Sequence, residues 1–221
     1  MKRLIEGYQH FQKEVFPAHR DEFADLSRGQ HPEVLFITCA DSRIVPNMIT
    51  QTDPGDIFIV RNVGNIVPPH GEFTGGVTSA IEYGVLALGI KHIVVLGHSD
   101  CGAMKGLLHP EKLTNMKGVL AWLQHAQAAK SVVEENSPNL TGDELLHAVT
   151  EENVLIQLDH LRTHPSVAAR LRRGTVFLHA WIYDIATGSL RTWHAGHKRF
   201  YPLGDITTED AYRALISENS L

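Results

Sequence analysis

The sequence predicts an α/β protein with a mostly parallel central β-sheet that is flanked by helices and preceded by a helical arm. Short, continuous apolar runs rich in β-formers alternate along the chain with amphipathic stretches of helical periodicity. Continuous apolar strands that alternate with helices are typical of a parallel sheet covered on both faces. The 221 residues, 43% of them hydrophobic and 20% charged, are enough for one globular domain with its own core.

The chain begins with two polar, amphipathic stretches, residues 2–15 and 18–28, which we expect to be helices joined at Pro17. They contain none of the residues that suggest chemistry. We therefore predict a single domain over residues 1–221, in which residues 1–28 form an arm that packs on a partner subunit and buries its apolar side there.

Five segments are predicted to be strands, and two of them end at a residue that can bind a metal. The strands are expected at residues 34–38, 56–60, 92–97, 175–185 and 189–193. The first ends at Cys39 and the third at His98.

Helices are expected between and after these strands. They are placed at residues 77–89, 115–134, 142–162, 164–173 and 208–217. A turn-rich segment, ENSPNLTGD, separates the second helix from the third.

Charge and hydropathy exclude several classes of protein. The formal net charge is −5, which disfavours a nucleic-acid-binding protein, because such proteins usually carry a basic excess. No apolar run approaches the length of a membrane span. The N-terminal residues carry charges where a secretion signal needs an apolar stretch, so we expect a cytoplasmic protein in which a structural disulfide is unfavourable.

Three side chains at the predicted strand ends suggest a metal site. Cys39 and His98 each follow a strand, and Cys101 comes three residues after His98, at the start of a helix. If the two strands are neighbours, all three side chains converge at one edge of the sheet. Two thiolates and one imidazole suit Zn²⁺ with an open fourth position. The alternative is two buried thiols and an unrelated histidine, since free cysteine is often buried.

A carboxylate and a guanidinium stand close to the first cysteine. Asp41 and Arg43 follow Cys39 by two and four residues and can pair through two hydrogen bonds. The alternative is a surface ion pair in a loop.

Taken together, Cys39-x-Asp41-x-Arg43 and His98-x-x-Cys101 resemble the signature of the β-class carbonic anhydrases. The resemblance covers nearly the whole chain. It includes PGDIFIVRNVGNIVPP (54–69), the helix with Ala80-Ile81-Glu82-Tyr83, GHSDCGAMKGLL (97–108), ENVLIQL (152–158), THPSV (163–167) and HAWIYDI (179–185). Among bacterial members, the chain looks most like the carbonic anhydrases encoded with cyanate-degrading enzymes.

The resemblance implies one Zn²⁺ per chain, held by Cys39, His98 and Cys101, and reversible hydration of CO₂ to bicarbonate and a proton by zinc-bound hydroxide. It assigns Asp41, paired with Arg43, to orient the hydroxide. In this family the aspartate can also leave the arginine and become a fourth zinc ligand, which gives an inactive form.

The resemblance also implies a substrate pocket and an oligomer. Gln30, Phe58, Tyr83 and Gly102 match residues of the family's pocket. In the family this glutamine comes from a neighbouring subunit, so we expect a homo-oligomer. It should be at least a dimer, and a tetramer is favoured. Gly102 is expected to let the backbone approach the substrate closely. The alternatives are that Gln30 is an ordinary loop amide, that Phe58 and Tyr83 are core aromatics, and that Gly102 is a glycine at the start of a helix.

A second anion site known in some members is expected to be impaired. Arg61 and Tyr183 match its arginine and tyrosine, but Phe36 stands where the family has a tryptophan and has no hydrogen-bond donor for bicarbonate. Ser99 and Asp100 are interpreted as caps of the helix that follows.

Two other functions remain open at this point. The first is a related zinc hydrolase that acts on COS or CS₂, because one fold can carry several chemistries. The second is a non-enzymatic dimer in which the two thiols act as a zinc or redox switch. A switch has no need of the Asp41–Arg43 pair.

Overall fold

The computed structural model describes residues 1–72 and 75–206, and these residues fall into two compact units. The first unit is Met1–His31, and the second begins at Pro32. The helix predicted at residues 208–217 lies outside the described residues.

The N-terminal unit is helical, but its helices do not break where the sequence predicted. Its segments are α1 (Lys2–His10), a π-helical turn (Phe11–Val15), α2 (Phe16–Ala18) and α3 (Arg20–Leu26). The predicted break at Pro17 is wrong. Pro17 lies in the first turn of α2, where a missing N–H is tolerated, and the backbone leaves helical geometry at His19 (φ −113°, ψ 24°). The rings of Phe11, Phe16 and Phe23 pack with centroids 5.2–6.1 Å apart and link these segments.

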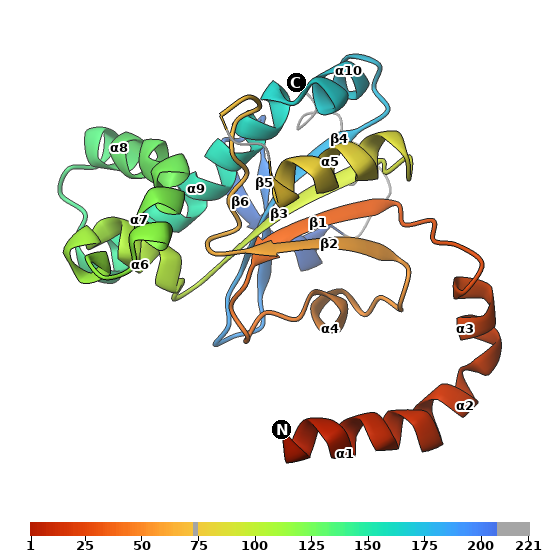
Figure 1. Ribbon diagram of the computed structural model, residues 1–221. Helices are drawn as coiled ribbons and strands as arrows, with labels where there is room; N and C mark the ends of the chain where they lie inside the picture. Colours follow the sequence, from red (N-terminus) through yellow and green to blue (C-terminus); the bar gives the residue numbers. More distant parts are fainter. Residues whose placement is uncertain (73–74, 207–221) are drawn as a thin grey trace. The chain divides into compact units, whose positions relative to one another are not determined.

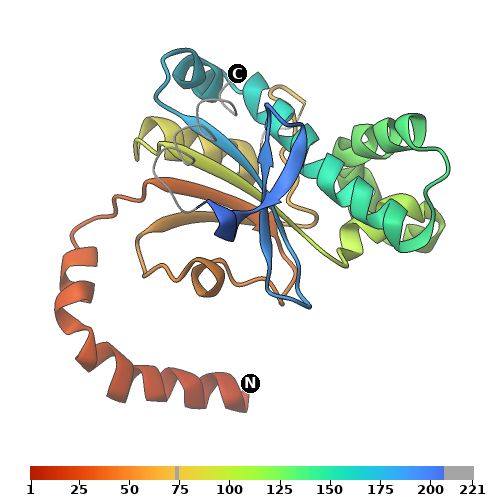
Figure 2. The same cartoon turned by 180° about the vertical axis from the view of Figure 1, so that it is seen from behind.

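Six strands of the described chain form one sheet, which confirms the predicted α/β fold (Figures 1 and 2). In spatial order they are β2 (Ile57–Asn62), β1 (Val34–Cys39), β3 (His92–His98), β4 (Phe177–Tyr183), β5 (Leu190–His194) and β6 (Arg199–Pro202). The four strands from β2 to β4 are parallel, and β5 and β6 are added antiparallel. Because parallel strands end at the same edge, β1 and β3 bring Cys39 and His98 together there.

Helices cover both faces of the parallel part of the sheet. The α-helices of this unit are α4 (Pro46–Thr50), α5 (Gly76–Leu86), α6 (Gly102–Leu108), α7 (Lys117–Leu123), α8 (Gln127–Asn136), α9 (Gly142–Thr163) and α10 (Pro165–Arg172). Figure 1 shows α5 and α10 on one side of the sheet and α4 on the other. No helix among the described residues is long and apolar enough to cross a membrane.

The long helix α9 approaches β3 very closely, and Gly97 makes this approach possible. A Cβ at Gly97 would lie 2.6 Å from Val154 Cγ2 and 3.0 Å from Ile182 Cδ1. A side chain at this position would therefore push α9 off the sheet next to His98. Beyond the carboxyl ends of the strands, α6, α7 and α8 pack with the first half of α9 (Figure 1).

Three features of this unit differ from the predicted elements. The helix expected at residues 115–134 is divided by a 3₁₀ turn at Gln124–Ala126. Leu123 and Ala126 are both buried, and a 3₁₀ turn puts residues three apart on one side. Helix α4 and strand β6 were not expected. The only local signal for α4 is a proline at its first position, and β6 depends on pairing with β5.

Candidate metal centre

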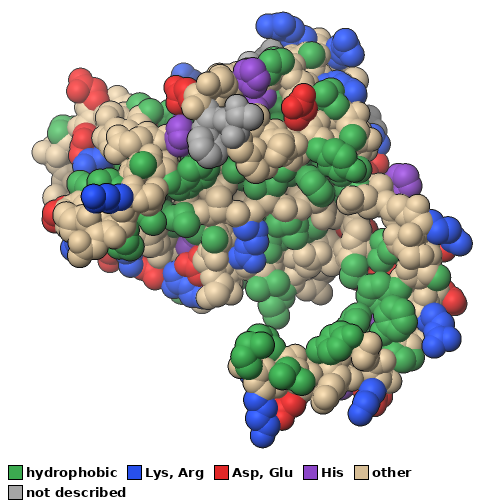
Figure 3. All heavy atoms as spheres, viewed as in Figure 1, with side chains coloured by type: hydrophobic (Ala, Val, Ile, Leu, Met, Phe, Trp, Pro, Cys, Tyr) green, Lys and Arg blue, Asp and Glu red, His purple; other side chains and the backbone are tan. Residues whose placement is uncertain are grey.

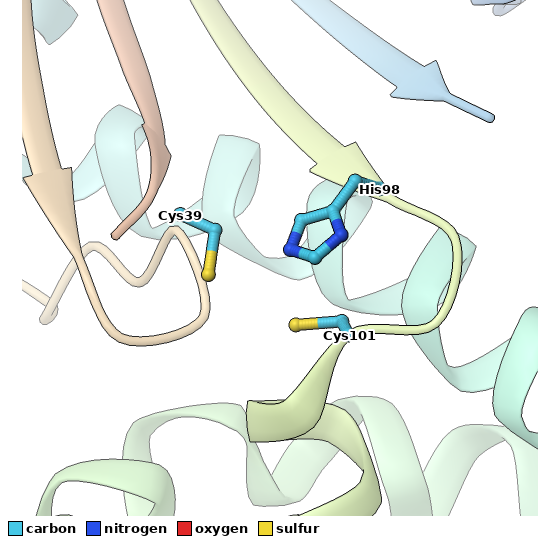
Figure 4. Close-up of side chains that lie close together, drawn as sticks. All are labelled: Cys39, His98 and Cys101. Carbon is cyan, nitrogen blue, oxygen red and sulfur yellow. The ribbon is translucent and has the colours of Figure 1, made fainter. Parts of the chain in front are cut away.

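Three metal-binding side chains meet at the carboxyl edge of the sheet. Cys39 is the last residue of β1, His98 is the last residue of β3, and Cys101 is the N-cap of α6. Their ligand atoms all lie within 4.8 Å of one another, and all three side chains are buried. Figure 4 shows the two sulfur atoms and the imidazole turned toward one another. The convergence expected from the sequence is therefore present, because β1 and β3 are neighbours.

The imidazole of His98 is set for metal binding. Its Nδ1 lies 2.8 Å from the Ser99 carbonyl oxygen, which can only accept, so Nδ1 carries the proton. The other nitrogen, Nε2, is buried and has no hydrogen-bond partner among the described residues. Nε2 therefore presents a lone pair to the two thiols, in the arrangement that metal-binding histidines use.

The two cysteines have free thiols that interact with each other. A hydrogen bond from Cys101 lowers the pKa of the Cys39 thiol, and the backbone N–H of Gly64, 3.5 Å from Cys39 Sγ, acts in the same direction. The same contact with Cys39, together with burial, raises the pKa of Cys101. A cation between the two sulfurs would be needed to ionise both thiols at once. Two sulfur donors and one nitrogen donor fit Zn²⁺, with one position left for water or substrate.

Asp41 lies beside the three candidate ligands and is held there by hydrogen bonds from Arg43. Arg43 donates from Nε to Asp41 Oδ1 at 3.0 Å and from one terminal nitrogen to Oδ2 at 2.8 Å, and its backbone N–H also reaches Oδ1 at 3.0 Å. These hydrogen bonds hold the pKa of the Asp41 carboxyl well below its usual range. Asp41 Oδ2 lies 3.9 Å from His98 Nε2, so the carboxylate borders the centre without entering it.

Arg43 is also held by a second carboxylate, which the sequence interpretation missed. Its other terminal nitrogen donates to Asp100 Oδ2 at 2.9 Å, and Lys105 pairs with the same carboxylate. The predicted capping by Ser99 and Asp100 is wrong. The N-cap of α6 is Cys101, the Ser99 hydroxyl accepts from the backbone N–H of Ile185, and Asp100 has a left-handed backbone (φ 59°) that turns it toward Arg43. Sequence spacing does not show such a turn.

The residues that match the family's second anion site have other partners here. Arg61 donates to three backbone carbonyl oxygens at the end of β1 and in the loop after it, those of Cys39, Asp41 and Ile44, at 2.7–3.1 Å. It therefore fixes the loop that carries Asp41. Phe36 is buried on β1 with its ring 6.0 Å from that of Trp181, and Tyr183 lies beside His98 in the strand register.

The residues expected to line the substrate pocket are not gathered at the centre within one chain. Phe58 and Tyr83 contact each other, with ring centroids 6.2 Å apart, but Phe58 stands four positions before the end of β2, about 13 Å away at the rise of a strand. Gln30 is exposed and belongs to the N-terminal unit, so its place in the pocket stays a prediction. Gly102 begins α6 next to Cys101, and a Cβ there would meet nothing within 4 Å.

Known proteins resemble both the sequence and the fold. The carbonic anhydrase family profile matches residues 34–190. A carbonic anhydrase of Synechococcus elongatus is 48% identical over 191 residues, which are 86% of this chain and 70% of that one. The solved structure of the β-carbonic anhydrase CcaA superposes with a TM-score of 0.90 at 46% identity and covers 91% of each chain. The structures of two tetrameric β-carbonic anhydrases from Sordaria macrospora include one that matches with a TM-score of 0.69 at 31% identity, covering 92% of this chain and 93% of that one.

The family profile spans most of the chain, and the relatives match well beyond the metal-binding residues. The chain therefore belongs to the β-carbonic anhydrase family, whose enzymes interconvert carbon dioxide and bicarbonate.

Proposed function

We propose that Cys39, His98 and Cys101 bind one Zn²⁺ per chain and that this centre catalyses CO₂ + H₂O ⇌ HCO₃⁻ + H⁺, with Asp41 and Arg43 orienting the attacking oxygen. The observation that carries the proposal is the buried Nε2 of His98, which has no hydrogen-bond partner among the described residues and lies within 4.8 Å of two thiol sulfurs. A buried lone pair is costly unless a ligand takes it. When bound, zinc acts as a Lewis acid that makes hydroxide available from water near neutral pH.

Asp41 acts as a fixed hydrogen-bond acceptor at the centre. Because Arg43 keeps its pKa low, Asp41 stays ionised at assay pH and can accept a hydrogen bond but not donate one. Arg43 occupies both carboxylate oxygens from one side, which leaves Oδ2 facing the ligands. An oxygen that donates its hydrogen to Oδ2 has its lone pair turned away from Asp41, toward the place where the carbon of CO₂ must be attacked.

We also propose that a second copy of the chain completes the substrate pocket. Tyr83 is half exposed although it is a large aromatic residue, and its partner Phe58 lies too far along β2 to reach the centre of its own chain. The N-terminal unit exposes Leu4, Ile5 and Tyr8, and Figure 3 shows hydrophobic side chains gathered along one side of these helices. Apolar surfaces of this kind support association between copies. The Sordaria macrospora relatives are tetrameric, which also supports an oligomer.

The ligand set also supports a cytoplasmic location. Both cysteines are free, and free thiols persist in a reducing compartment, whereas disulfides form in oxidising ones. The association with cyanate-degrading enzymes stays a prediction.

The proposal is tested by stopped-flow CO₂ hydration at pH 8.5, with zinc quantified on the same samples of wild type and the Cys101→Ser variant. We expect rapid turnover and about one zinc per chain in the wild type, and a loss of both in the variant, since two protein ligands hold zinc far less well than three. Zinc without CO₂ turnover in the wild type would contradict the proposed reaction, and the same sample would then be assayed with COS. An absence of both zinc and turnover in fully reduced wild type would contradict the metal site.

A further inference from the structure

The connection after β2 touches both elements that carry the cysteines. The backbone N–H of Gly64 donates to Cys39 Sγ at 3.5 Å. On its other side, a Cβ at Gly64 would lie 3.0 Å from Ala103 Cβ, in the first turn of the helix that follows Cys101. Figure 4 shows this connection passing beside the Cys39 sulfur. The peptide between Val63 and Gly64 therefore lies where a small rotation would make or break a hydrogen bond to a metal ligand.

A tryptophan from α7 holds the opposite end of that peptide. The indole Nε1 of Trp122 donates to the Val63 carbonyl oxygen at 2.8 Å. The C=O of Val63 and the N–H of Gly64 belong to one planar, trans peptide group, so they point in opposite directions. Trp122 therefore fixes the plane from one side and aims the N–H of Gly64 at Cys39 on the other.

The next peptide is held from α9 by a buried amide. Asn153 Nδ2 donates to the Gly64 carbonyl oxygen at 3.1 Å, and its Oδ1 accepts from Gln157 at 2.9 Å. Gln157 in turn accepts from the backbone N–H of Val67 at 2.8 Å. Asn153 and Gln157 are both 0% exposed. Buried amides are retained only when their hydrogen bonds are made, and here each of the two amides makes one with the connection after β2.

Two further side chains of α9, and that of His164 directly after the helix, bind the same stretch of backbone. His160 Nδ1 donates to the Val67 carbonyl oxygen (2.7 Å), Thr163 Oγ1 accepts from the N–H of His70 (2.8 Å), and His164 Nε2 donates to the Pro68 carbonyl oxygen (3.0 Å). Asn153, Gln157, His160 and Thr163 recur every three or four positions and so share one face of α9. That face holds a loop in place in addition to packing a core.

We infer that Trp122 and Asn153 are positioning residues for the metal ligand Cys39: they fix the two peptides that flank Gly64, so that the Gly64 N–H donates to the Cys39 sulfur. This inference rests on the proposed function, because it assumes that Cys39 binds the metal. A hydrogen bond to a ligating sulfur withdraws electron density from it and fixes its direction. Neither Trp122 nor Asn153 is among the three residues whose ligand atoms converge, and both act through this backbone.

The test uses Trp122→Phe, which removes the indole N–H and keeps an aromatic ring, with Trp193→Phe on β5 as the matched control. A second pair is Asn153→Leu with Thr150→Val; the Thr150 hydroxyl donates to the Leu146 carbonyl oxygen of its own helix. Each protein is loaded with Co²⁺ for its thiolate-to-metal absorption band and with Zn²⁺ for chelator competition. We expect Trp122→Phe and Asn153→Leu to move the band to longer wavelength and to weaken zinc binding about 10- to 100-fold.

The outcomes separate this inference from the proposed function. Wild-type protein that binds neither Co²⁺ nor Zn²⁺ would contradict both the proposed function and the positioning role. Wild type that binds metal, with Trp122→Phe matching Trp193→Phe in band position and zinc affinity, would overturn only the positioning role. If Asn153→Leu does not fold, Trp122→Phe still decides the question. A ¹¹³Cd-loaded wild type adds a direct measurement: a scalar coupling between the metal and the Gly64 amide proton is expected, and its absence would contradict the inference.

Discussion

Asp41 Oδ2 lies 3.9 Å from Nε2 of His98 while Arg43 holds both oxygens of the same carboxylate. The carboxylate is thus next to the ligand set and prevented from joining it. An acidic side chain left free at this distance could turn toward a cation, so the guanidinium determines whether Asp41 is a neighbour or a ligand.

Replacing Asp41 by Asn should abolish most activity and leave the metal bound. The amide keeps the shape of the side chain but loses its charge and one acceptor, so the attacking oxygen is no longer oriented. We expect kcat/KM to fall by about 100-fold or more, the usual contribution of a positioned proton acceptor. Stopped-flow kinetics and metal analysis check this. Asp159→Asn, which breaks an exposed Asp–Arg pair of 3.0 Å on α9, is the control and should change neither.

Arg43→Lys should be far more damaging than Asp100→Asn, although both break hydrogen bonds of Arg43. Lysine cannot reproduce the bidentate hydrogen bonding of Arg43 to the Asp41 carboxylate. The Arg43–Asp100 pair is half exposed on both sides and is therefore worth little. We expect kcat to fall at least about 10-fold for Arg43→Lys and by less than about threefold for Asp100→Asn. Equal losses in the two variants would show that Asp100 matters as much as Asp41.

Gly64→Ala should destabilise the protein for two separable reasons. Gly64 has φ +84°, and a Cβ there would lie 3.0 Å from that of Ala103. The strained backbone and the close contact should together lower the free energy of unfolding by about 2–4 kcal/mol. In an Ala103→Gly background the contact disappears and the strain stays, so the loss should shrink by about 1 kcal/mol or more. Urea unfolding of the four metal-free proteins measures this cycle, and strictly additive losses would refute the contact.

Acid should destabilise the fold in part through His179. Burial lowers the pKa of His179 to about 3, and His92 beside it, 3.1 Å away, acts in the same direction. As the pH falls below the ordinary histidine pKa, His179 binds a proton in the unfolded chain but stays neutral in the folded one. The contribution of His179 to the free energy of unfolding is therefore complete above that pKa and is lost as the pH falls below it. The free energy of unfolding should fall by about 1.4 kcal/mol per pH unit from this residue below pH 6. His179→Asn should have a shallower acid limb than wild type in urea unfolding of metal-free protein from pH 7.5 to 4.5. If the free energy of unfolding falls with pH equally steeply in both proteins, the acid sensitivity comes from other residues.

Mixed oligomers test whether the pocket is shared between copies. Asp41→Asn leaves a chain without a working centre, and Gln30→Ala leaves one without the predicted pocket glutamine. If Gln30 acts on the partner's centre, a mixture that exchanges subunits contains one site with both residues intact. We expect activity above that of either variant alone, approaching a quarter of the wild-type value per chain for a random dimer of two poor variants. A mixture that never exceeds the mean of its components, with exchange verified by mass spectrometry, would place Gln30 in its own chain's site or outside the pocket.

The core of the fold could be predicted from the sequence because its signals are local. The runs that became β1 and β3 are apolar on both faces, and each ends at a residue with metal-binding chemistry. One rule about parallel strands then brings Cys39 and His98 together. Asp41 and Arg43 are two residues apart, so their pairing also needed no knowledge of the rest of the chain.

What the sequence could not provide depends on tertiary contacts. Asp100 reaches Arg43 only because its backbone is left-handed, and that turn follows from how β3 leads into α6. The hydrogen bonds of Trp122 and Asn153 depend on how α7 and α9 are rotated against a loop far away in sequence. Strand β6 exists because β5 offers it an edge. Neither residue type nor spacing carries this information.

The placement of the ligands on separate strands has a consequence for how the protein is made. β1 and β3 lie side by side, but β2 and α5 come between them along the chain. A partly synthesised chain that has reached only β2 holds one of the three ligands. The ion can therefore be captured only after β3 has been added to the sheet and α6 has begun at Cys101. Binding of a metal by all three residues should follow the pairing of β1 with β3, and it cannot serve as the nucleus around which the chain first collapses.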